Sequence, residues 1–381
     1  MSSSHVAPYV LDDASLHLLR AGVAAGIPGN ESHVKLPSVG RIDWAGLQYA
    51  ATLGKLLSIA QRGFARMGLE TPEQFRNAAA SYRRETLAAN AVNLTTIQHL
   101  IRILEEADLP FLIFKGPLQQ KMLYGDYFLR PSTDIDVLVA WKDFDRAADC
   151  LQRSGYELPQ ECQTPWWRIF LGEQHFFYPG RASATIDLHH RLQQPGSPAP
   201  RHLSAFLTDI QDVPVGKALA PTMSRINTAL ISSISLTKAF IRLEPAGGYI
   251  CDLSAALLAM SVEERRALTA RAGRQGLTNT LRFAIRCARE TLFLPALEGV
   301  PSGLPSTRLS GRDLAGMLFT PLDPTLQRPK LRYILWDLSD SSGMGGKAGT
   351  YMFEALNKVA AKACHDLYKV SPAPEQATPH P

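Results

Sequence analysis

The sequence predicts an α+β fold, in which a small mixed sheet with flanking helices lies between a helical N-terminal segment and a mainly helical C-terminal domain. Three observations support this. Apolar residues recur with helical spacing through most of the first hundred residues and again in the second half. Between these regions come short apolar runs of strand length, bounded by turn-forming residues. Hydrophobic residues make up 45% of the 381 and charged residues 20%, which is typical of a folded globular chain.

The first part of the chain is predicted to be helical. Helices are expected over Leu16–Ile27 and Ala45–Met67, where apolar residues repeat with the period of a helix. A longer helix is expected to begin with Thr71 at its N-cap and Pro72 at its first position, and to run to about Ala107. The polar residues Asn90, Asn93, Thr95 and Thr96 lie inside this predicted helix and allow a kink there. The pattern by itself predicts three packed helices that carry no chemistry.

The pattern then changes to short apolar runs that have the length of buried strands. A helix is expected over Trp141–Ser154, and Pro179-Gly180 marks a turn. The predicted strands are Phe111–Phe114, Ile135–Val139, Gln174–Tyr178 and Thr185–Leu188. Together these elements predict a small mixed sheet with helices beside it.

A proline-rich stretch, QQPGSPAP, separates the sheet unit from the helical region that follows. The tail SPAPEQATPHP cannot bury apolar surface and is predicted to be disordered. The predicted helices are Met223–Arg242, Tyr249–Met260, Val262–Ala272, Leu277–Leu292 and Gly349–Val370, with a loop-rich stretch over Pro301–Leu331. The predicted boundaries are 1–108 for the N-terminal helical segment, 109–195 for the sheet-containing core, 196–370 for the C-terminal domain and 371–381 for the tail.

Charge and cysteine usage narrow the class of protein. The 40 Lys and Arg residues exceed the 35 Asp and Glu residues by a net charge of +5, a small and scattered excess that does not predict a nucleic-acid partner. The five cysteines form no C-x-x-C pair, which is typical of reduced thiols in the cytoplasm. No secretory signal and no apolar run of membrane-spanning length is found. We therefore expect a cytoplasmic protein without a membrane partner.

The most informative segment contains two acidic residues, Asp134 and Asp136, at the start of a predicted strand. Residues two apart on a strand face the same side, so the two carboxylates are expected to converge. Converging carboxylates repel each other unless a cation lies between them, and hard oxygen ligands favour Mg²⁺ or Mn²⁺. The same Asp-x-Asp pattern also occurs as ordinary surface acid at strand ends, so it does not decide between these alternatives alone.

A third acidic residue strengthens the metal-site interpretation. Asp187 lies in the apolar run ATIDLHHRL, so it can stand on a neighbouring strand beside the pair. Three carboxylates on adjacent strands are what a two-metal phosphoryl-transfer site requires. Lys115 and Gly116 suit the phosphate side of such a site, because glycine allows close backbone approach and lysine supplies a point charge.

Taken together, these motifs resemble a group of proteins with the nucleotidyltransferase-like fold, the uncharacterised bacterial nucleotidyltransferases. The resemblance covers about 75 residues. The matching residues are Lys115-Gly116, Tyr124-Gly125-Asp126, Arg130-Pro131, Asp134-Ile135-Asp136 and Ile186-Asp187-Leu188-His189. A weaker match extends to Lys238 and Asp252 in the following helices, where Ser235 and Phe240 stand near the lysine and the histidines usual in the family pattern are missing.

The resemblance implies a metal-dependent transferase that moves a nucleoside monophosphate from an NTP, with ATP favoured, to an acceptor hydroxyl and releases pyrophosphate. It implies that residues 109–195 form the catalytic core. Asp134, Asp136 and Asp187 would be the catalytic residues and the ligands of Mg²⁺ or Mn²⁺, and Asp187 would help take the proton from the acceptor. The implied nucleotide-binding residues are Lys115, Gly116, Arg130, Ser132 and Lys238. Pro117 departs from the Gly-Ser pair of many nucleotidyltransferases, because proline has neither a hydroxyl nor an N–H to offer.

Alternatives stay open for the whole chain and for several positions. The protein could instead be a catalytically inactive nucleotide-binding or interaction module, or a toxin-like enzyme that modifies RNA or protein, and the acceptor could be a small molecule or a peptide. His189 and His190 can contact metal or phosphate or can be structural. Trp166-Trp167 can stack on a base or pack in the core. The stretch 341–350 fails the test for a phosphate-binding loop and is predicted to be a flexible linker.

Overall fold

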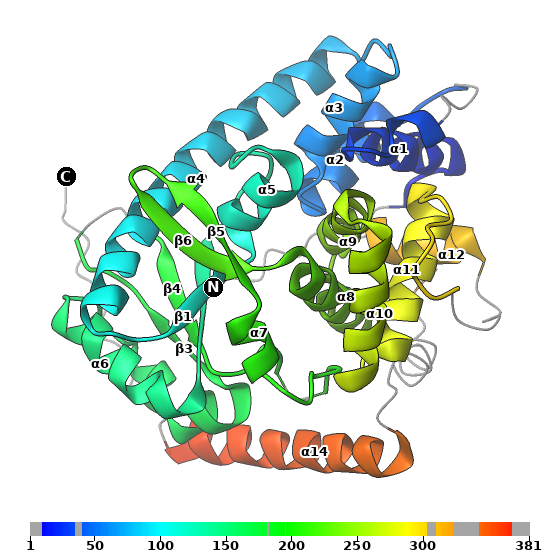
Figure 1. Cartoon of the computed structure of the whole chain (residues 1–381). Helices are drawn as coiled ribbons and strands as arrows, with labels where there is room; N and C mark the ends of the chain where they lie inside the picture. Colours follow the sequence, from blue (N-terminus) through cyan, green and yellow to red (C-terminus); the bar gives the residue numbers. More distant parts are fainter. Residues whose placement is uncertain are drawn as a thin grey trace.

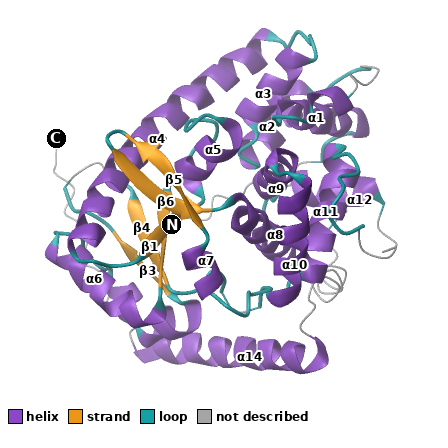
Figure 2. Ribbon diagram, in the orientation of Figure 1, coloured by secondary structure: helices purple, strands orange, loops and turns teal. Residues whose placement is uncertain are grey.

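The computed structural model of the chain contains one open six-stranded mixed sheet with the strand order β3-β4-β2-β1-β6-β5 (Figure 1). Helices surround this sheet and make up most of the remaining structure, as Figure 2 shows. The structure describes residues 10–34, 40–180, 183–194, 196–302, 310–323, 326 and 343–367. The α+β fold class predicted from the sequence is confirmed.

The strands of the sheet run in mixed directions. β2 is parallel to β4 and β1 is parallel to β6, whereas the β1–β2, β3–β4 and β5–β6 pairs are antiparallel. The strands are β1 (Phe111–Phe114), β2 (Asp134–Val139), β3 (Glu173–Phe176), β4 (Thr185–His189), β5 (Ile210–Val215) and β6 (Ala218–Met223). β5 and β6 were not predicted, and they extend the sheet beyond residue 195. Each contains a proline, Pro214 or Pro221, which weakens the strand signal because proline lacks a ladder donor.

The two faces of the sheet differ in chemistry. One face is apolar and packs against α4 (Glu73–Glu106) and α6 (Phe144–Arg153). Its buried residues on β2 and β4 are Ile135, Val137, Val139, Ile186 and Leu188. The alternate residues of the same strands include Asp134, Asp136 and Asp187 and point to the opposite face, because successive side chains of a strand alternate in direction. The chemistry of the sheet is therefore confined to one side.

The N-terminal segment breaks where a continuous helix was expected. The prediction of one helix over Ala45–Met67 is wrong, because the chain leaves the helical conformation at Lys55, whose φ is +56°. The long helix α4 is helical through all of its 34 residues and begins after Pro72 without a side-chain cap, so Thr71 is not its N-cap. The helices before α4 are α1 (Asp13–Gly26), α2 (Trp44–Leu53) and α3 (Leu57–Arg66), with a 3-10 turn η1 (Glu31–His33).

Helices from both halves of the chain pack together beside the charged face of the sheet (Figure 1). One apolar cluster contains Leu18 and Phe64 from the N-terminal helices together with Phe240 and Phe283 from the C-terminal ones. The helices after β1 are α5 (Gly116–Tyr124), α7 (Ser204–Thr208), α8 (Arg225–Arg242), α9 (Gly247–Ala259), α10 (Val262–Arg274), α11 (Thr278–Leu292) and α12 (Gly311–Phe319), with short turns η2 (Trp141–Asp143), η3 (Gln160–Gln163) and η4 (Trp166–Leu171). We call α1–α3 and α8–α12 the helical layer.

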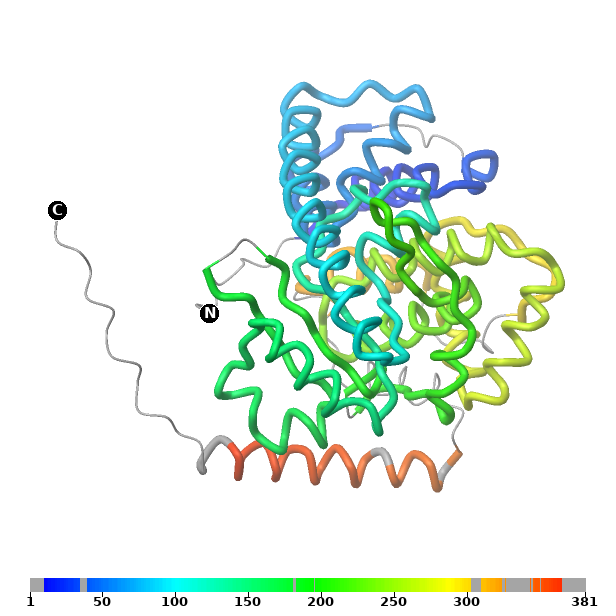
Figure 3. The backbone as a smooth tube through the Cα atoms, turned by 60° about the vertical axis from the view of Figure 1, so that its left-hand side comes forward, coloured from blue at the N-terminus to red at the C-terminus, as the bar shows by residue number. Residues whose placement is uncertain are grey.

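The C-terminal part differs from the prediction in two places. The stretch predicted to be loop-rich contains α12, and the flexible linker predicted over 341–350 is wrong for the described residues, because α14 (Gly343–Leu367) begins there. Figure 3 shows α14 crossing one end of the molecule. The predicted tail 371–381 lies outside the described residues. Within the ranges that the structure describes, no helix combines the length and the apolar composition needed to cross a membrane.

Candidate active site

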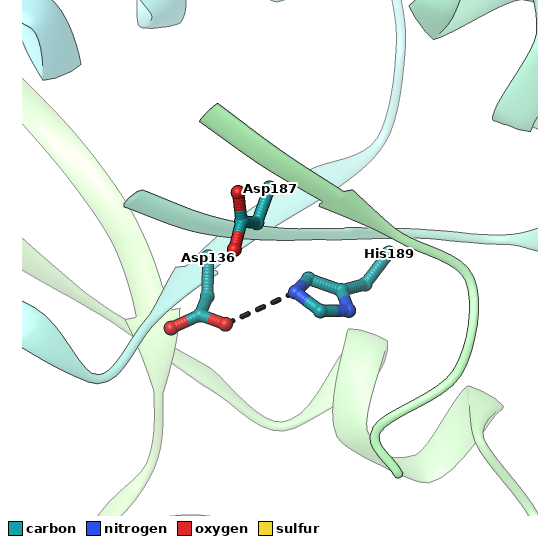
Figure 4. A group of neighbouring side chains, drawn as sticks. All are labelled: Asp136, Asp187 and His189. Carbon is teal, nitrogen blue, oxygen red and sulfur yellow. Dashed lines mark hydrogen bonds and ion pairs between the residues drawn. The ribbon is translucent and has the colours of Figure 1, made fainter. Parts of the chain in front are cut away.

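The charged face of the sheet brings together acidic residues from β2 and β4. These strands pair in register, so that Asp136 lies opposite Asp187 and Asp134 lies opposite Thr185. His189, two residues beyond Asp187, shares this face. Figure 4 shows the side chains of Asp136, Asp187 and His189 gathered at one point. Regular strand pairing is therefore enough to assemble this group.

Asp136, Asp187 and His189 have the composition of a metal site. One ligand atom from each lies within 4.8 Å of the other two, and His189 Nε2 is 3.0 Å from Asp136 Oδ1. Asp187 Oδ1 is buried and has no hydrogen-bond partner among the described residues. A buried polar atom without a partner is costly and requires an explanation. A divalent cation held by these three residues would supply the partner, so the group fits such an ion.

Asp134 lines the same cavity but is not a member of this group. Burial raises the pKa of Asp134, and the neighbouring Asp136 adds to the increase. Burial likewise raises the pKa of Asp187 to about 6, an effect that His175 only partly offsets. A raised carboxyl pKa means that the charged form lacks stabilising partners. A bound cation would remove this deficit at both positions.

Lys115 supplies positive charge next to Asp136. Its Nζ lies 3.3 Å from Asp136 Oδ1. Burial lowers the pKa of Lys115, but Asp136, Tyr249 and Asp134 together outweigh this effect and raise the pKa above its ordinary value. In turn, Lys115 and His189 hold the pKa of Asp136 well below its usual range despite burial. Lys115 and Gly116 have φ values of +62° and +58°, a left-handed turn that a lysine rarely adopts, and this turn carries Lys115 from the end of β1 into the cavity.

Two ionisable residues of β3, Glu173 and His175, complete the charged face, and sequence reasoning missed them. The antiparallel pairing of β3 with β4 places Glu173 opposite His189 and His175 opposite Asp187. His189 Nδ1 is 3.4 Å from Glu173 Oε2, and His175 Nε2 is 3.6 Å from Asp187 Oδ2. Burial raises the pKa of Glu173, but hydrogen bonding to His175 and the charge of His189 bring it down to about 2. Glu173 and His175 occupy alternate positions shortly before the Pro179-Gly180 turn, and this spacing could have indicated that they share one face of a strand.

Buried asparagines of α4 hold the loop that carries Arg130 and Ser132. Asn90 donates to the backbone carbonyls of Tyr127 and Arg130 at 2.7 and 2.9 Å, and it accepts the N–H of Ser132 at 2.9 Å. Asn93 donates to the Ser132 carbonyl at 2.9 Å. Asn90 and Asn93 therefore do not kink α4, which is continuous, but hold this loop in position.

The side chain of Arg130 is bound to the helical layer. Its Nη2 lies 2.8 and 2.7 Å from the two carboxylate oxygens of Asp252 on α9. Asp252 also accepts hydrogen bonds from Gln119 and Tyr124 of α5 at 2.8 and 2.9 Å. The charge of Arg130 is thus compensated inside the protein. Arg130 lines the cavity, and its contact with a nucleotide stays a prediction.

Two lysines from the helical layer also line the cavity, Lys238 on α8 and Lys55 at the break between α2 and α3. Burial lowers the pKa of both, and the charge of Asp134 opposes this effect at Lys55. The described part of the chain offers neither lysine an ion-pair partner. Sequence reasoning missed Lys55, because its surroundings have an uninterrupted helical pattern. The cavity has a volume of about 510 Å³, within the range of small-molecule sites.

The other aromatic and histidine candidates are engaged within the protein. His190 Nε2 is 2.7 Å from a backbone carbonyl oxygen of η4. Trp166 donates its indole N–H to Asn357 of α14 at 2.7 Å, and the ring of Trp167 packs edge-on against His175 at 4.6 Å. Among these side chains, Trp167 contacts the charged face, because its ring packs against His175.

A small mixed sheet with acidic residues gathered on one face is the arrangement expected of enzymes that transfer phosphorus-containing groups. The sequence model of the family described as "uncharacterised nucleotidyltransferase" matches residues 40–293, well over half of the chain. The chain belongs to this family, so the family expected from the sequence is confirmed. It is a nucleotidyltransferase, a transferase of phosphorus-containing groups, and the family implies an NTP substrate. The match covers the sheet, α2–α4 and α8–α11 and ends before α14. No curated protein matches the chain.

Proposed function

We propose that the protein is a cytoplasmic, Mg²⁺- or Mn²⁺-dependent nucleotidyltransferase that moves a nucleoside monophosphate from an NTP, with ATP favoured, to an acceptor hydroxyl. The observation that carries this proposal is the group formed by Asp136, Asp187 and His189. It combines a buried carboxylate oxygen that has no partner among the described residues with a cavity of nucleotide size. A divalent ion bound there would stabilise charge on the phosphates and lower the pKa of the acceptor hydroxyl.

The carboxylates divide the work in this proposal. Asp134 and Asp136 on β2 would hold the metal that neutralises the nucleotide phosphates, and Asp187 on β4 would hold the metal that activates the acceptor hydroxyl. The acceptor oxygen forms a bond to the α-phosphorus while the bond to pyrophosphate breaks. In this proposal the hydroxyl proton passes to Asp187, the carboxylate assigned to the acceptor side. The products are the nucleotidylated acceptor and pyrophosphate.

Five residues are proposed to bind the NTP: three cations, one glycine and one serine. Lys115 and Lys238 supply positive charge from two sides of the cavity, and Arg130 lies beside them on its loop. Gly116 leaves room for the phosphates. Ser132 would replace the serine that Pro117 excludes, since a Cβ added at Gly116 would lie only 3.2 Å from Ser132 Oγ. A hydroxyl is therefore present at this turn although the usual sequence position lacks one.

Mass spectrometry tests this proposal directly. The protein is incubated with a cell lysate, which contains metabolites, peptides, proteins and RNA, together with Mg²⁺ and each NTP in turn, and the added mass identifies nucleotide and acceptor together. We expect one or a few species to gain the mass of a nucleoside monophosphate, with release of an equal amount of pyrophosphate. Binding of NTP without any transfer would instead favour the inactive nucleotide-binding module. Labelled RNA would favour the toxin-like alternative.

The paired measurement of affinity and turnover tests the role of Asp187. Asp187→Asn should leave the affinity for Mg²⁺·NTP within ~1 kcal/mol by calorimetry and abolish transfer, because the acceptor side loses its carboxylate. Asp212→Asn, an exposed aspartate on β5, is the matched control and should change neither quantity. Equal loss of affinity and turnover in Asp187→Asn would show that the assigned division among the carboxylates is wrong.

A further inference from the structure

A second cavity adjoins the proposed catalytic one. It has a volume of about 470 Å³ and lies between the connector 196–203, the turn at Gln275-Gly276 and α14. α14 contributes Gly346, Gly349 and Phe353 to its wall. Figure 3 shows that α14 runs across one end of the molecule, from the sheet side to the helical layer. The cavity depends on a helix that the family match does not include.

The two cavities share one wall, the segment 192–194. This segment follows β4 directly, so it begins three residues after His189 of the metal-binding group. Gln194 is fixed in place, because it donates to Glu173 at 2.8 Å and accepts from Arg242 at 2.7 Å. Gln193 Oε1 is buried and has no hydrogen-bond partner among the described residues. An unsatisfied acceptor at the junction of two cavities is suited to bind a donor on a ligand that spans both.

The two cavities differ in charge. The catalytic cavity is lined by acidic residues of β2, β3 and β4, whereas no Asp or Glu is among the residues found to line the second cavity. Arg191 and Arg201 line it instead. Within the described ranges neither arginine forms an ion pair, and the Arg191 guanidinium lies over the Phe353 ring at 5.1 Å. Glu354 of α14, which lies against Gly196, is itself paired with Lys358 at 3.3 Å.

From this arrangement we infer that the second cavity binds the acceptor, and that the acceptor carries a carboxylate or phosphate group. Its anionic group binds Arg191 and Arg201, and its hydroxyl reaches past Gln193 to the carboxylates of the catalytic cavity. Guanidinium groups bind planar and tetrahedral oxyanions through paired N–H donors, which explains why arginine rather than lysine lines this cavity. This inference rests on the proposed function, because it assigns the second substrate of the same reaction.

Fractionation by charge tests the inference. A metabolite and peptide extract is divided on an anion-exchange column, and each fraction is incubated with the protein, Mg²⁺ and α-³²P-labelled NTP. We expect label to enter products from the retained, anionic fraction and not from the flow-through. Arg191→Gln/Arg201→Gln should lower the yield of label at least ~10-fold while changing the Mg²⁺·NTP dissociation constant less than about twofold. Arg312→Gln, at an exposed arginine of α12, should leave both unchanged.

The single variant Arg201→Gln guards against a folding defect, because Arg201 is exposed whereas Arg191 is half-buried. It should lower the yield of label by about threefold or more. Two results would overturn the inference: label in products from the flow-through alone, or an unchanged yield in both arginine variants. Mass spectrometry of the labelled product then shows whether its anionic group is a carboxylate or a phosphate. Absence of label from every fraction with wild-type protein would overturn the proposed function and this inference together.

Discussion

The two faces of the sheet are built from the same strands, yet they serve different purposes. On β2 and β4, the residues Ile135, Val137 and Leu188 are buried against α4 and α6, where they contribute to the core. Asp136 and Asp187, their immediate neighbours in sequence, face a cavity and contribute little apolar burial. Alternation along a strand thus separates stability from chemistry at a distance of one residue. Substitutions at adjacent positions should therefore have effects of different kinds.

The charged face is itself uneven. Asp136 is compensated by Lys115 and His189, and its pKa is lowered despite burial. Asp187 has a raised pKa and a buried oxygen without a partner among the described residues. One carboxylate is therefore stabilised by the folded protein, and the other is held in place at a cost in stability. This contrast is what a site prepared for a cation requires, since a ligand binds best where the protein leaves a charge uncompensated.

The largest effect is expected from Asp136→Asn. The substitution keeps the shape of the side chain but removes the charge of a proposed metal ligand and of the partner of Lys115, so transfer should fall at least ~100-fold. Product formation from labelled NTP is the measurement, and circular dichroism is the control for folding. Turnover close to that of wild type in a folded variant would show that Asp136 is not a residue of the active site. The proposed difference between the two faces of the sheet would then be wrong.

Leu188→Ala, next to Asp187 but on the apolar face, should have the opposite profile. Leu188 is fully buried, and its truncation should lower the free energy of unfolding by about 2–5 kcal/mol. Below the unfolding temperature, the affinity for Mg²⁺·NTP should change less than about twofold. Urea denaturation and calorimetry measure the two quantities. A large loss of affinity without a loss of stability would mean that the faces are not separate in function.

Asp187→Asn should make the metal-free protein more stable at neutral pH. The pKa of about 6 in the folded protein exceeds the ordinary value of 3.8, so the folded state binds this proton more tightly than the unfolded state. The contribution of Asp187 to the stability of wild type should therefore decrease as the pH rises from about 4 through about 6. The variant lacks this loss. Its free energy of unfolding should exceed that of wild type by on the order of 1–3 kcal/mol above pH 6, and the two values should be about equal near pH 4.

Urea denaturation in EDTA at a series of pH values measures this difference. Addition of Mg²⁺ should stabilise wild type more than the variant, because the ion compensates the carboxylate that the variant lacks. If the two proteins show the same dependence of stability on pH, Asp187 is already compensated in the folded state. The uneven charged face would then need another explanation.

The smallest effect is expected at Lys55, where the helical layer contributes charge to the cavity. Lys55→Gly removes the ammonium and places glycine at a φ of +56°, a conformation that glycine adopts more readily than lysine. Affinity for Mg²⁺·NTP should fall about 3–10-fold, while the melting temperature should stay the same or rise. Lys55→Arg should retain most of the affinity. A fall in melting temperature with unchanged affinity would make Lys55 a structural residue only.

The sequence predicted the parts of this molecule that depend on local pattern. The alternation around Asp134 and Asp136, the run containing Asp187 and most helices can be read from spacing alone. The register of the strands cannot be predicted in this way, because it depends on which strands pair. Glu173 and His175 were therefore missed, although a strand was expected in this part of the chain. Lys55 was missed for a related reason, since the helix break at this residue leaves the periodic apolar pattern of the sequence intact. Roles for Asn90 and Asn93 required knowing which loop lies beside α4.

The in-register pairing of β2 with β4 also decides which changes of length the site can survive. Removal of a single strand residue such as Ile135 would turn the aspartates of β2 to opposite faces, while every acidic residue of the site would still be present. Insertions in the connections between strands have no such effect, because loops accept extra residues at the surface. A deletion can therefore silence this enzyme without touching any residue that performs its chemistry, and a sequence with all of the site residues is intact only if the spacing between them is also kept.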